Sequence, residues 1–220
     1  MKTHRDLLRR MLHACISVFG LMLLVAGCGG GDGTLRVEGS GTDEFEVFDA
    51  RGQNQLYSAD SGSEVQLPAG RYVLFVNGAG ARILVRGGRQ LTVELATLSV
   101  QGLGVDTYDV LDATGERTLL ARKVGSVSEL LPGEYQVRMN GASMMIEATA
   151  GKRIELETGA LRAADEGPPI VTVYDPAGKR LVFRSAGKPI ELLPGAYVAD
   201  YAGEKRPIEI KPGELLELTP

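Results

Sequence analysis

The 220-residue sequence is poor in the side chains that many enzymes use for nucleophilic or metal chemistry. It has two histidines and two cysteines, and His4, His13 and Cys15 all fall within the first 27 residues. Beyond that point, Cys28 is the one remaining residue of either type. A folded part without imidazole and without a second thiol excludes Ser-His-Asp and Cys-His catalysis, zinc sites built on His or Cys, and a disulfide. An enzyme would have to work with carboxylates, lysines or hydroxyls alone.

Residues 1–27 have the three-part pattern of an export signal. An apolar stretch from about residue 11 to residue 26 ends on small residues and is short for a membrane-spanning helix. The basic residues before it are Lys2, Arg5, Arg9 and Arg10. The sequence therefore predicts an N-terminal signal helix.

The end of this segment, Val25-Ala26-Gly27-Cys28, resembles the bacterial lipobox, in which small residues precede a cysteine that is diacylated on sulfur before cleavage. The resemblance implies a lipoprotein signal peptide over residues 1–27, cleavage between Gly27 and Cys28, and lipidation of Cys28. The Gly-rich residues 28–33 then form a flexible tether. The alternatives are an ordinary signal peptide with a coincidental cysteine, and an uncleaved anchor.

Loss of residues 1–27 changes the charge balance. They hold four of the 24 basic and one of the 28 acidic residues, which leaves 20 and 27, a net charge of −7. So acidic a mature chain is a poor candidate for binding nucleic acid or an anionic membrane surface. We expect a lipid-anchored protein of the cell envelope. Because Gly29 follows Cys28 in place of aspartate, resemblance to the Gram-negative sorting signal implies the outer membrane; in a Gram-positive cell the anchor would face outward from the plasma membrane.

The rest of the chain repeats itself. Residues 34–52 align without a gap to residues 97–115, and the same offset of 63 continues into a third copy whose opening segment has diverged. We therefore predict three repeats, over 34–96, 97–159 and 160–220. The most regularly repeated residues are Asp49, Asp112 and Asp175, together with Gly52, Gly115 and Gly178.

Within each copy the apolar residues alternate with a period of two, as in half-buried strands. Phe45 and Val47 point one way, for example, and Glu46 points the other. No segment after Cys28 has a helical period with a capping box. The pattern predicts an all-β chain of three tandem small β-sandwiches, each with about five to seven strands. A single closed three-fold fold is the alternative, for which a period of 63 is long.

The repeated polar and Pro-Gly positions are typical of turns. Asp at the first and Gly at the fourth position of "DARG", "DATG" and "DPAG" predict type I turns. Pro132-Gly133 and Pro194-Gly195 predict type II turns, and the segment at Pro68 has one residue more. The tyrosine after each of these segments is interpreted as a core anchor whose hydroxyl finds a backbone partner.

A calcium site is the competing interpretation of the acidic turns, with Asp106 and Asp109 near the turn of the second copy. These two differ in strand parity and so face opposite ways. The dense ligand spacing of an EF-hand loop is also missing. We expect no metal and no cofactor.

The run "VTVYDPAGKRL…IELLPGAYVADYAG…IEIKPGELLEL" resembles the bacterial β-sandwich modules of the carboxypeptidase-regulatory-like, Cna-B and PEGA groups, which share a prealbumin-like plan. The resemblance covers all three copies. It implies an extracytoplasmic interaction or spacer module. The PEGA tetrapeptide itself is missing, and no residues match the internal isopeptide bond of some Cna-B domains.

A unit of about 60 residues without disulfide or metal is marginal alone, so we expect neighbouring copies to dock against one another. The favoured function is a non-catalytic scaffold or protein-interaction lipoprotein. Its partners would be the membrane, through acyl chains, and an unidentified envelope protein or glycan. A glycan- or peptide-binding module is the alternative; its candidates are the outward aromatics Phe48 and Tyr174, a set that Leu111 interrupts.

Overall fold

A computed structural model describes residues 31–165 and 170–219. The chain is all-β there, and seven strands form each of three small sandwiches. Sandwich 1 consists of β1 (Gly33–Glu38), β2 (Glu44–Phe48), β3 (Gln55–Asp60), β4 (Glu64–Leu67), β5 (Gly70–Val76), β6 (Ala79–Val85) and β7 (Gln90–Glu94). One sheet has the order β4-β1-β7 and the other β3-β2-β5-β6. Every pairing is antiparallel except the parallel pair β1 and β7.

The other two sandwiches repeat this topology strand for strand. Sandwich 2 consists of β8 (Ala96–Gln101), β9 (Thr107–Asp112), β10 (Thr118–Lys123), β11 (Val127–Leu130), β12 (Gly133–Met139), β13 (Ala142–Ala148) and β14 (Arg153–Glu157). Sandwich 3 consists of β15 (Gly159–Ala163), β16 (Ile170–Tyr174), β17 (Arg180–Ser185), β18 (Ile190–Leu192), β19 (Gly195–Tyr201), β20 (Glu204–Ile210) and β21 (Leu215–Leu218).

The core of each sandwich follows the predicted alternation. Phe45 and Val47 on β2 are completely buried, and Glu46 between them is only half-buried on the outer face. The prediction of an all-β chain of small sandwiches is confirmed. The predicted signal helix falls on residues 1–27, outside the described residues.

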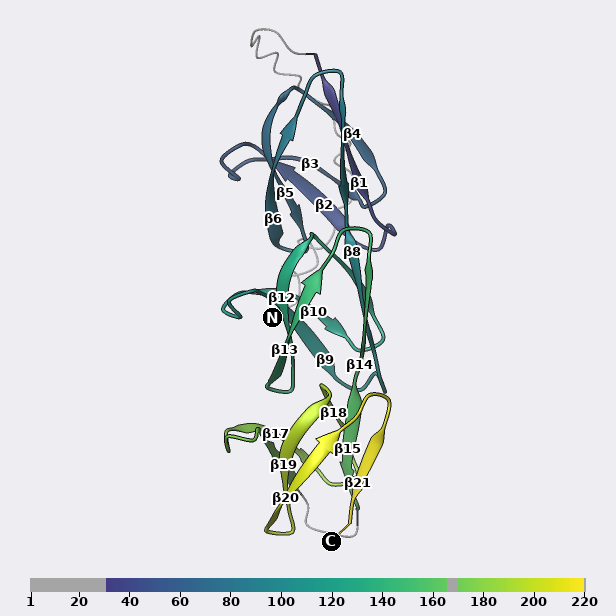
Figure 1. The fold of residues 1–220 in the computed structure, drawn as a ribbon, viewed down its shortest axis with the longest axis vertical. Coiled ribbons are helices and arrows are strands. Elements are labelled where there is room, and N and C mark those ends of the chain that lie inside the picture. Colours follow the sequence, from purple (N-terminus) through teal and green to yellow (C-terminus); the bar gives the residue numbers. More distant parts are fainter. Residues whose placement is uncertain (1–30, 166–169, 220) are drawn as a thin grey trace, which may run out of the picture.

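The three sandwiches are stacked along one axis as a rod (Figure 1). A single residue separates β7 from β8, and a single residue separates β14 from β15. These residues, Leu95 and Thr158, are 4% and 2% exposed. Nearly all of the buried apolar side chains belong to one continuous cluster, which draws on all three sandwiches. The closed three-fold alternative is therefore wrong, because only consecutive sandwiches meet.

The Pro-Gly segments differ from the predicted type II turns. Gly133 and Gly195 have φ of 157° and 153°, whereas a type II turn needs about +80° at this position. Each glycine is instead the first residue of a strand, β12 or β19. Nor is the first copy longer, since two residues connect the strands in every copy: 68–69, 131–132 and 193–194. Pro68 therefore corresponds to Leu131.

Candidate functional site

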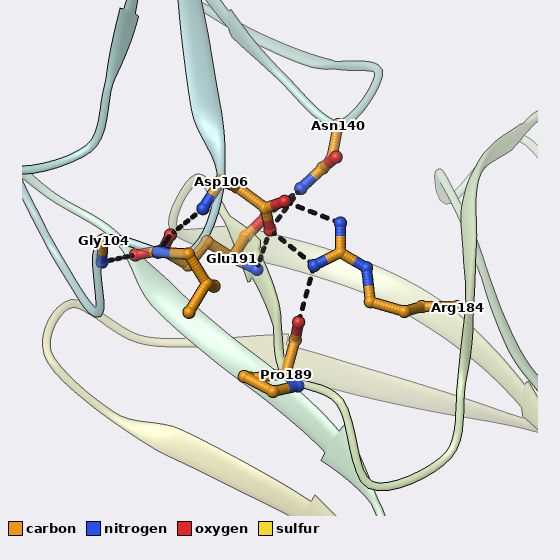
Figure 2. Close-up of polar contacts among 7 residues, drawn as sticks. Gly104, Asp106, Asn140, Arg184, Pro189 and Glu191 are labelled. Atoms are coloured by element: carbon orange, nitrogen blue, oxygen red, sulfur yellow. Dashed lines mark hydrogen bonds and ion pairs between the residues drawn. The ribbon is translucent and has the colours of Figure 1, made fainter.

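The most elaborate polar arrangement in the described residues lies where one sandwich meets the next. Glu191 on β18 points away from the core of sandwich 3 and is nevertheless completely buried, because the β8–β9 loop of sandwich 2 covers it. Its carboxylate accepts hydrogen bonds from the backbone N–H groups of Gly104, Val105 and Asp106 at 3.0, 2.8 and 2.7 Å (Figure 2). A buried carboxylate is tolerated when its oxygens are occupied in this way.

Asp106 of sandwich 2 binds sandwich 3 in the opposite direction, with its own carboxylate as the acceptor. Its carboxylate accepts the backbone N–H of Glu191 at 2.9 Å and the Asn140 amide at 3.0 Å. Arg184 of sandwich 3 donates to both Asp106 oxygens, at 2.6 and 3.1 Å, and also to the Pro189 carbonyl (Figure 2). The Asp106 side chain is 10% exposed and that of Arg184 25%. This geometry is that of a bidentate ion pair, the stronger and more directional form.

The junction between sandwiches 1 and 2 uses the same residue types. Glu129 on β11 is completely buried and accepts from Ser40, Asp43 and Ser61 of sandwich 1. Asp43 in turn accepts the Glu129 N–H and the Arg122 guanidinium, both at 2.7 Å. We call each set of Asp, Glu, Arg and Asn a junction lock: Asp43, Glu129, Arg122 and Asn77 form the first, and Asp106, Glu191, Arg184 and Asn140 the second.

Two further sequence features serve the locks. Asn77 and Asn140 adopt left-handed φ of 48° and 46°, and their amides donate to the carbonyls of Glu129 and Glu191 at 3.0 and 2.8 Å. A glycine, Gly39 or Gly102, lies against each buried glutamate, and a Cβ there would collide with the carboxylate. These positions therefore require a residue without a side chain.

Sequence reasoning missed the locks, although a signal was present. The glutamates stand in "SELLPG" and "IELLPG", each flanked by apolar or small residues that are buried. A charged residue inside such a run needs a partner. That partner could not be found locally, because the three backbone N–H groups that bind the Glu191 carboxylate lie 85 to 87 residues earlier in the chain, and the Thr158 hydroxyl lies 33 residues earlier.

The three repeated Asp residues lie in exposed turns that connect the second and third strands of each sandwich. The N–H groups of Gly52, Gly115 and Gly178 donate to the Asp49, Asp112 and Asp175 carbonyls at 2.9, 2.9 and 3.0 Å, and the glycines have φ of 70°, 73° and 88°. Hydrogen bonds from the Gln53 N–H and the Asn54 amide lower the pKa of Asp49. The Thr114 hydroxyl is the main cause of the lowered pKa of Asp112. These carboxylates are thus engaged by their own turns.

The tyrosines after the Pro segments make one contact three times. The hydroxyls of Tyr72, Tyr135 and Tyr197 donate to the carbonyls of Pro68, Leu131 and Leu193, each at 2.7 Å. Burial raises the pKa of all three phenols, that of Tyr197 to about 12. The predicted backbone partner of the hydroxyl is confirmed, and Pro132 and Pro194 lie just beyond the accepting carbonyls.

Asp106 and Asp109, the calcium candidates, do not converge. Asp106 belongs to the second junction lock, and Asp109 pairs with Arg138 of the neighbouring strand at 2.9 Å. Within residues 31–165 and 170–219, no group of three or more His, Cys, Asp or Glu residues is arranged to hold a metal ion.

The outward aromatic candidates have separate environments. Phe48 packs edge-on against Phe75 at 5.1 Å between ring centroids. Tyr174 lies under the Lys205 ammonium, 4.5 Å from the ring centroid. Leu111, at the corresponding position of sandwich 2, is completely buried. The four-stranded sheets therefore present three different outer faces.

Residues Gly27 and Cys28, the predicted cleavage and lipidation positions, lie outside the described residues. Across the part of the chain that the structure describes, no helix has the length and hydrophobicity needed to cross a membrane.

Comparison with known proteins finds no matching family model and no matching curated protein. Among solved structures, the Bacillus anthracis TIE protein is 19% identical over 86% of this chain, with a TM-score of 0.25; the chain spans half of that protein's length. GBS52, the minor pilin of Streptococcus agalactiae, is 10% identical over 58% of this chain and 94% of its own, with a TM-score of 0.25. The pilus adhesin SpaC from Lactobacillus rhamnosus GG is 10% identical over 86% of this chain and 43% of its own, with a TM-score of 0.19.

Proposed function

We propose that the protein is a lipid-anchored lipoprotein of the cell envelope that acts as a stiff, non-catalytic scaffold. The observation that carries the stiff scaffold is the pair of junction locks, whereas the lipid anchor rests on the lipobox-like Val25-Ala26-Gly27-Cys28. Each lock joins buried carboxylates of two sandwiches through hydrogen bonds in both directions, and each linker is one buried residue. A chain built in this way holds its far end at a constant distance from its near end, which is what a spacer or scaffold requires.

The composition supports the non-catalytic part of the proposal. No histidine and no cysteine follows Cys28. The acidic groups that are buried at the junctions have their oxygens occupied by donors of the neighbouring sandwich. They are therefore not free to act as general acids or bases.

Stiffness is tested by measuring a distance along the rod. Gln53 and Lys179 occupy equivalent exposed turn positions in sandwiches 1 and 3. Nitroxide labels on Gln53→Cys and Lys179→Cys of the mature chain should give one narrow distance distribution by double electron–electron resonance. A broad distribution would refute the stiff scaffold.

The anchor is tested separately by metabolic labelling with a fatty acid. Label should enter the wild-type protein and be lost in Cys28→Ser, because the sulfur that carries the acyl group is gone. Retention of label in the variant would show that the lipidation proposal is wrong. Fractionation of the labelled envelope then tests placement in the outer membrane.

A binding module for glycan or peptide is the second candidate function, favoured by the Phe48–Phe75 pair. These rings lie on the outer face of the four-stranded sheet of sandwich 1, where both are half-buried and leave ring surface open. Binding to a glycan array that is lost in Phe75→Ala would favour this function over a pure scaffold.

A further inference from the structure

Four exposed arginines lie on β5, β6 and the β6–β7 turn of sandwich 1, three of them at the end that faces away from sandwich 2. Arg71 is the second residue of β5, Arg82 is the middle residue of β6, and Arg86 and Arg89 flank the turn between β6 and β7. None of the four forms an ion pair within residues 31–165 and 170–219. Among the same described residues, ion pairs are made by seven other arginines, Arg36, Arg122, Arg138, Arg153, Arg162, Arg184 and Arg206, and not by Arg51, Arg117 or Arg180. We call the first four the arginine end.

The arginine end is also where the described chain begins. The Thr34 N–H donates to the Arg89 carbonyl at 2.9 Å, and the Gly88 N–H donates to the Asp32 carbonyl at 2.9 Å. This turn and the start of β1 lie together at the tip of the rod, opposite sandwich 3 (Figure 1). Cys28 precedes Asp32 by four residues, so even a fully extended chain separates them by about 14 Å at most.

The arginines are particular to the first copy. At the positions of Arg71, Arg82, Arg86 and Arg89, sandwich 2 has Glu134, Met145, Thr149 and Lys152, and sandwich 3 has Ala196, Pro207, Lys211 and Glu214. A role in folding the sandwich would apply to all three copies. The four arginines therefore serve a role other than folding, and this role is specific to sandwich 1.

The immediate surroundings favour a negatively charged, partly apolar surface. Leu84 is 48% exposed and shares the outward side of edge strand β6 with Arg82. Asp32 lies beside the β6–β7 turn, where its carbonyl accepts the Gly88 N–H, and Asp49 in the adjacent turn is engaged by donors of that turn. Basic and exposed apolar side chains also lie together in segments that rest in a membrane interface, where long basic side chains keep their charge at the headgroups.

We propose that the arginine end docks on anionic phospholipid headgroups of the membrane that holds the N-terminus, and so orients the rod away from that membrane. The inference rests on the proposed lipid anchor. The net charge of −7 disfavours contact between most of the molecule and an anionic membrane. The arginine end can still bind such a membrane, because electrostatic attraction acts only within about a Debye length of the surface. Each basic residue near an anionic surface favours the bound state roughly five-fold.

The test uses the complete lipidated protein in vesicles. Gln90 is exposed and next to Arg89, and a nitroxide on Gln90→Cys would report contact with headgroups through reduced access of an aqueous relaxation agent. Access should be lower on vesicles that contain phosphatidylglycerol than on phosphatidylcholine alone, and high salt should remove the difference. Arg86→Gln/Arg89→Gln should lower the ratio of docked to undocked protein about 25-fold.

The matched control is Lys152→Gln/Lys211→Gln, which removes the same charge at corresponding positions of the other sandwiches and should change nothing. Equal access on both kinds of vesicle, or an equal effect of the control pair, overturns the proposal. Failure of the anchor has a different signature, since the protein would then not float with phosphatidylcholine vesicles. In that case salt-sensitive flotation with phosphatidylglycerol vesicles would still support the arginine end, and no flotation would overturn it.

Discussion

Glu191 shows why a single carboxylate can hold two domains together. It is completely buried, so it has lost its hydration, and three backbone N–H groups of sandwich 2 replace the water. Hydrogen bonds to a charged group each contribute about 1.5 to 3 kcal/mol, and leaving a buried partner unsatisfied costs a similar amount. The contact therefore stabilises the junction only while both sides stay docked.

Glu191→Gln should lower the free energy of unfolding by about 2 kcal/mol, because the amide keeps the shape of the side chain but loses the charge and turns one acceptor into a donor. Urea denaturation measures the change. Glu209→Gln is the matched control, since Glu209 is exposed on β20 of the same sandwich, and it should stay within about 0.5 kcal/mol of the wild type. Equal midpoints for the two variants would mean that Glu191 does not stabilise the junction.

At the level of elements, the strands and their inward faces were predictable, because a period of two reports burial directly. Phe45 and Val47, or Val171 and Val173, are buried as the alternation predicts. The Pro-Gly segments were predicted less well. Local turn preferences favour a β-turn there, but sandwich topology needs a chain that crosses from one sheet to the other, so Gly133 starts a strand instead. The buried glutamates of the locks left a signal in the sequence. Their partners were not predictable, because they depend on how separate copies stack.

The tyrosine at the start of β5, β12 and β19 makes the sheet crossing sensitive to alkali. The folded state raises the pKa of Tyr197 from 10.0 to about 12, so it favours the neutral phenol. That contribution is fully present below pH 10 and is lost as the pH rises to 12, by about 2 to 3 kcal/mol for this residue. Tyr197→Phe should therefore be less stable than the wild type at neutral pH, by about 1 kcal/mol for the lost hydrogen bond, yet lose less stability between pH 10 and pH 12. Chemical denaturation of both proteins between pH 10 and pH 12 measures the free energy of unfolding. An equal loss of this free energy in both proteins would contradict the prediction.

At the scale of the whole molecule, the two tips of the rod lack the lock residues. Where the junctions have Glu129 and Arg122, the free face of sandwich 1 has Gln66 and Ala59. At the other tip, Ala202 stands where the junctions have asparagine, and Asp165 stands where they have a glycine. Terminal units of repeat arrays are atypical in this way because nothing stacks on them. Among the three, only sandwich 2 contributes to both locks: it supplies the Glu and Arg of the first lock and the Asp and Asn of the second.

Sandwich 2 should therefore be the unit by which the rod can be lengthened. A second copy of residues 96–158 is inserted after Thr158. At the new junction Asp106 and Asn140 of one copy would face Glu129 and Arg122 of the next, so the junction would form a complete lock. Small-angle scattering should show a maximum dimension greater by about a third, with an unchanged cross-section. The control inserts a second copy of residues 159–219 after Thr219, where the new junction would have Ala202 and Asp165 in place of Asn140 and Gly102. That chain should bend at the new joint and unfold there in a separate step. If both insertions give equally straight rods, the locks are not what aligns the sandwiches.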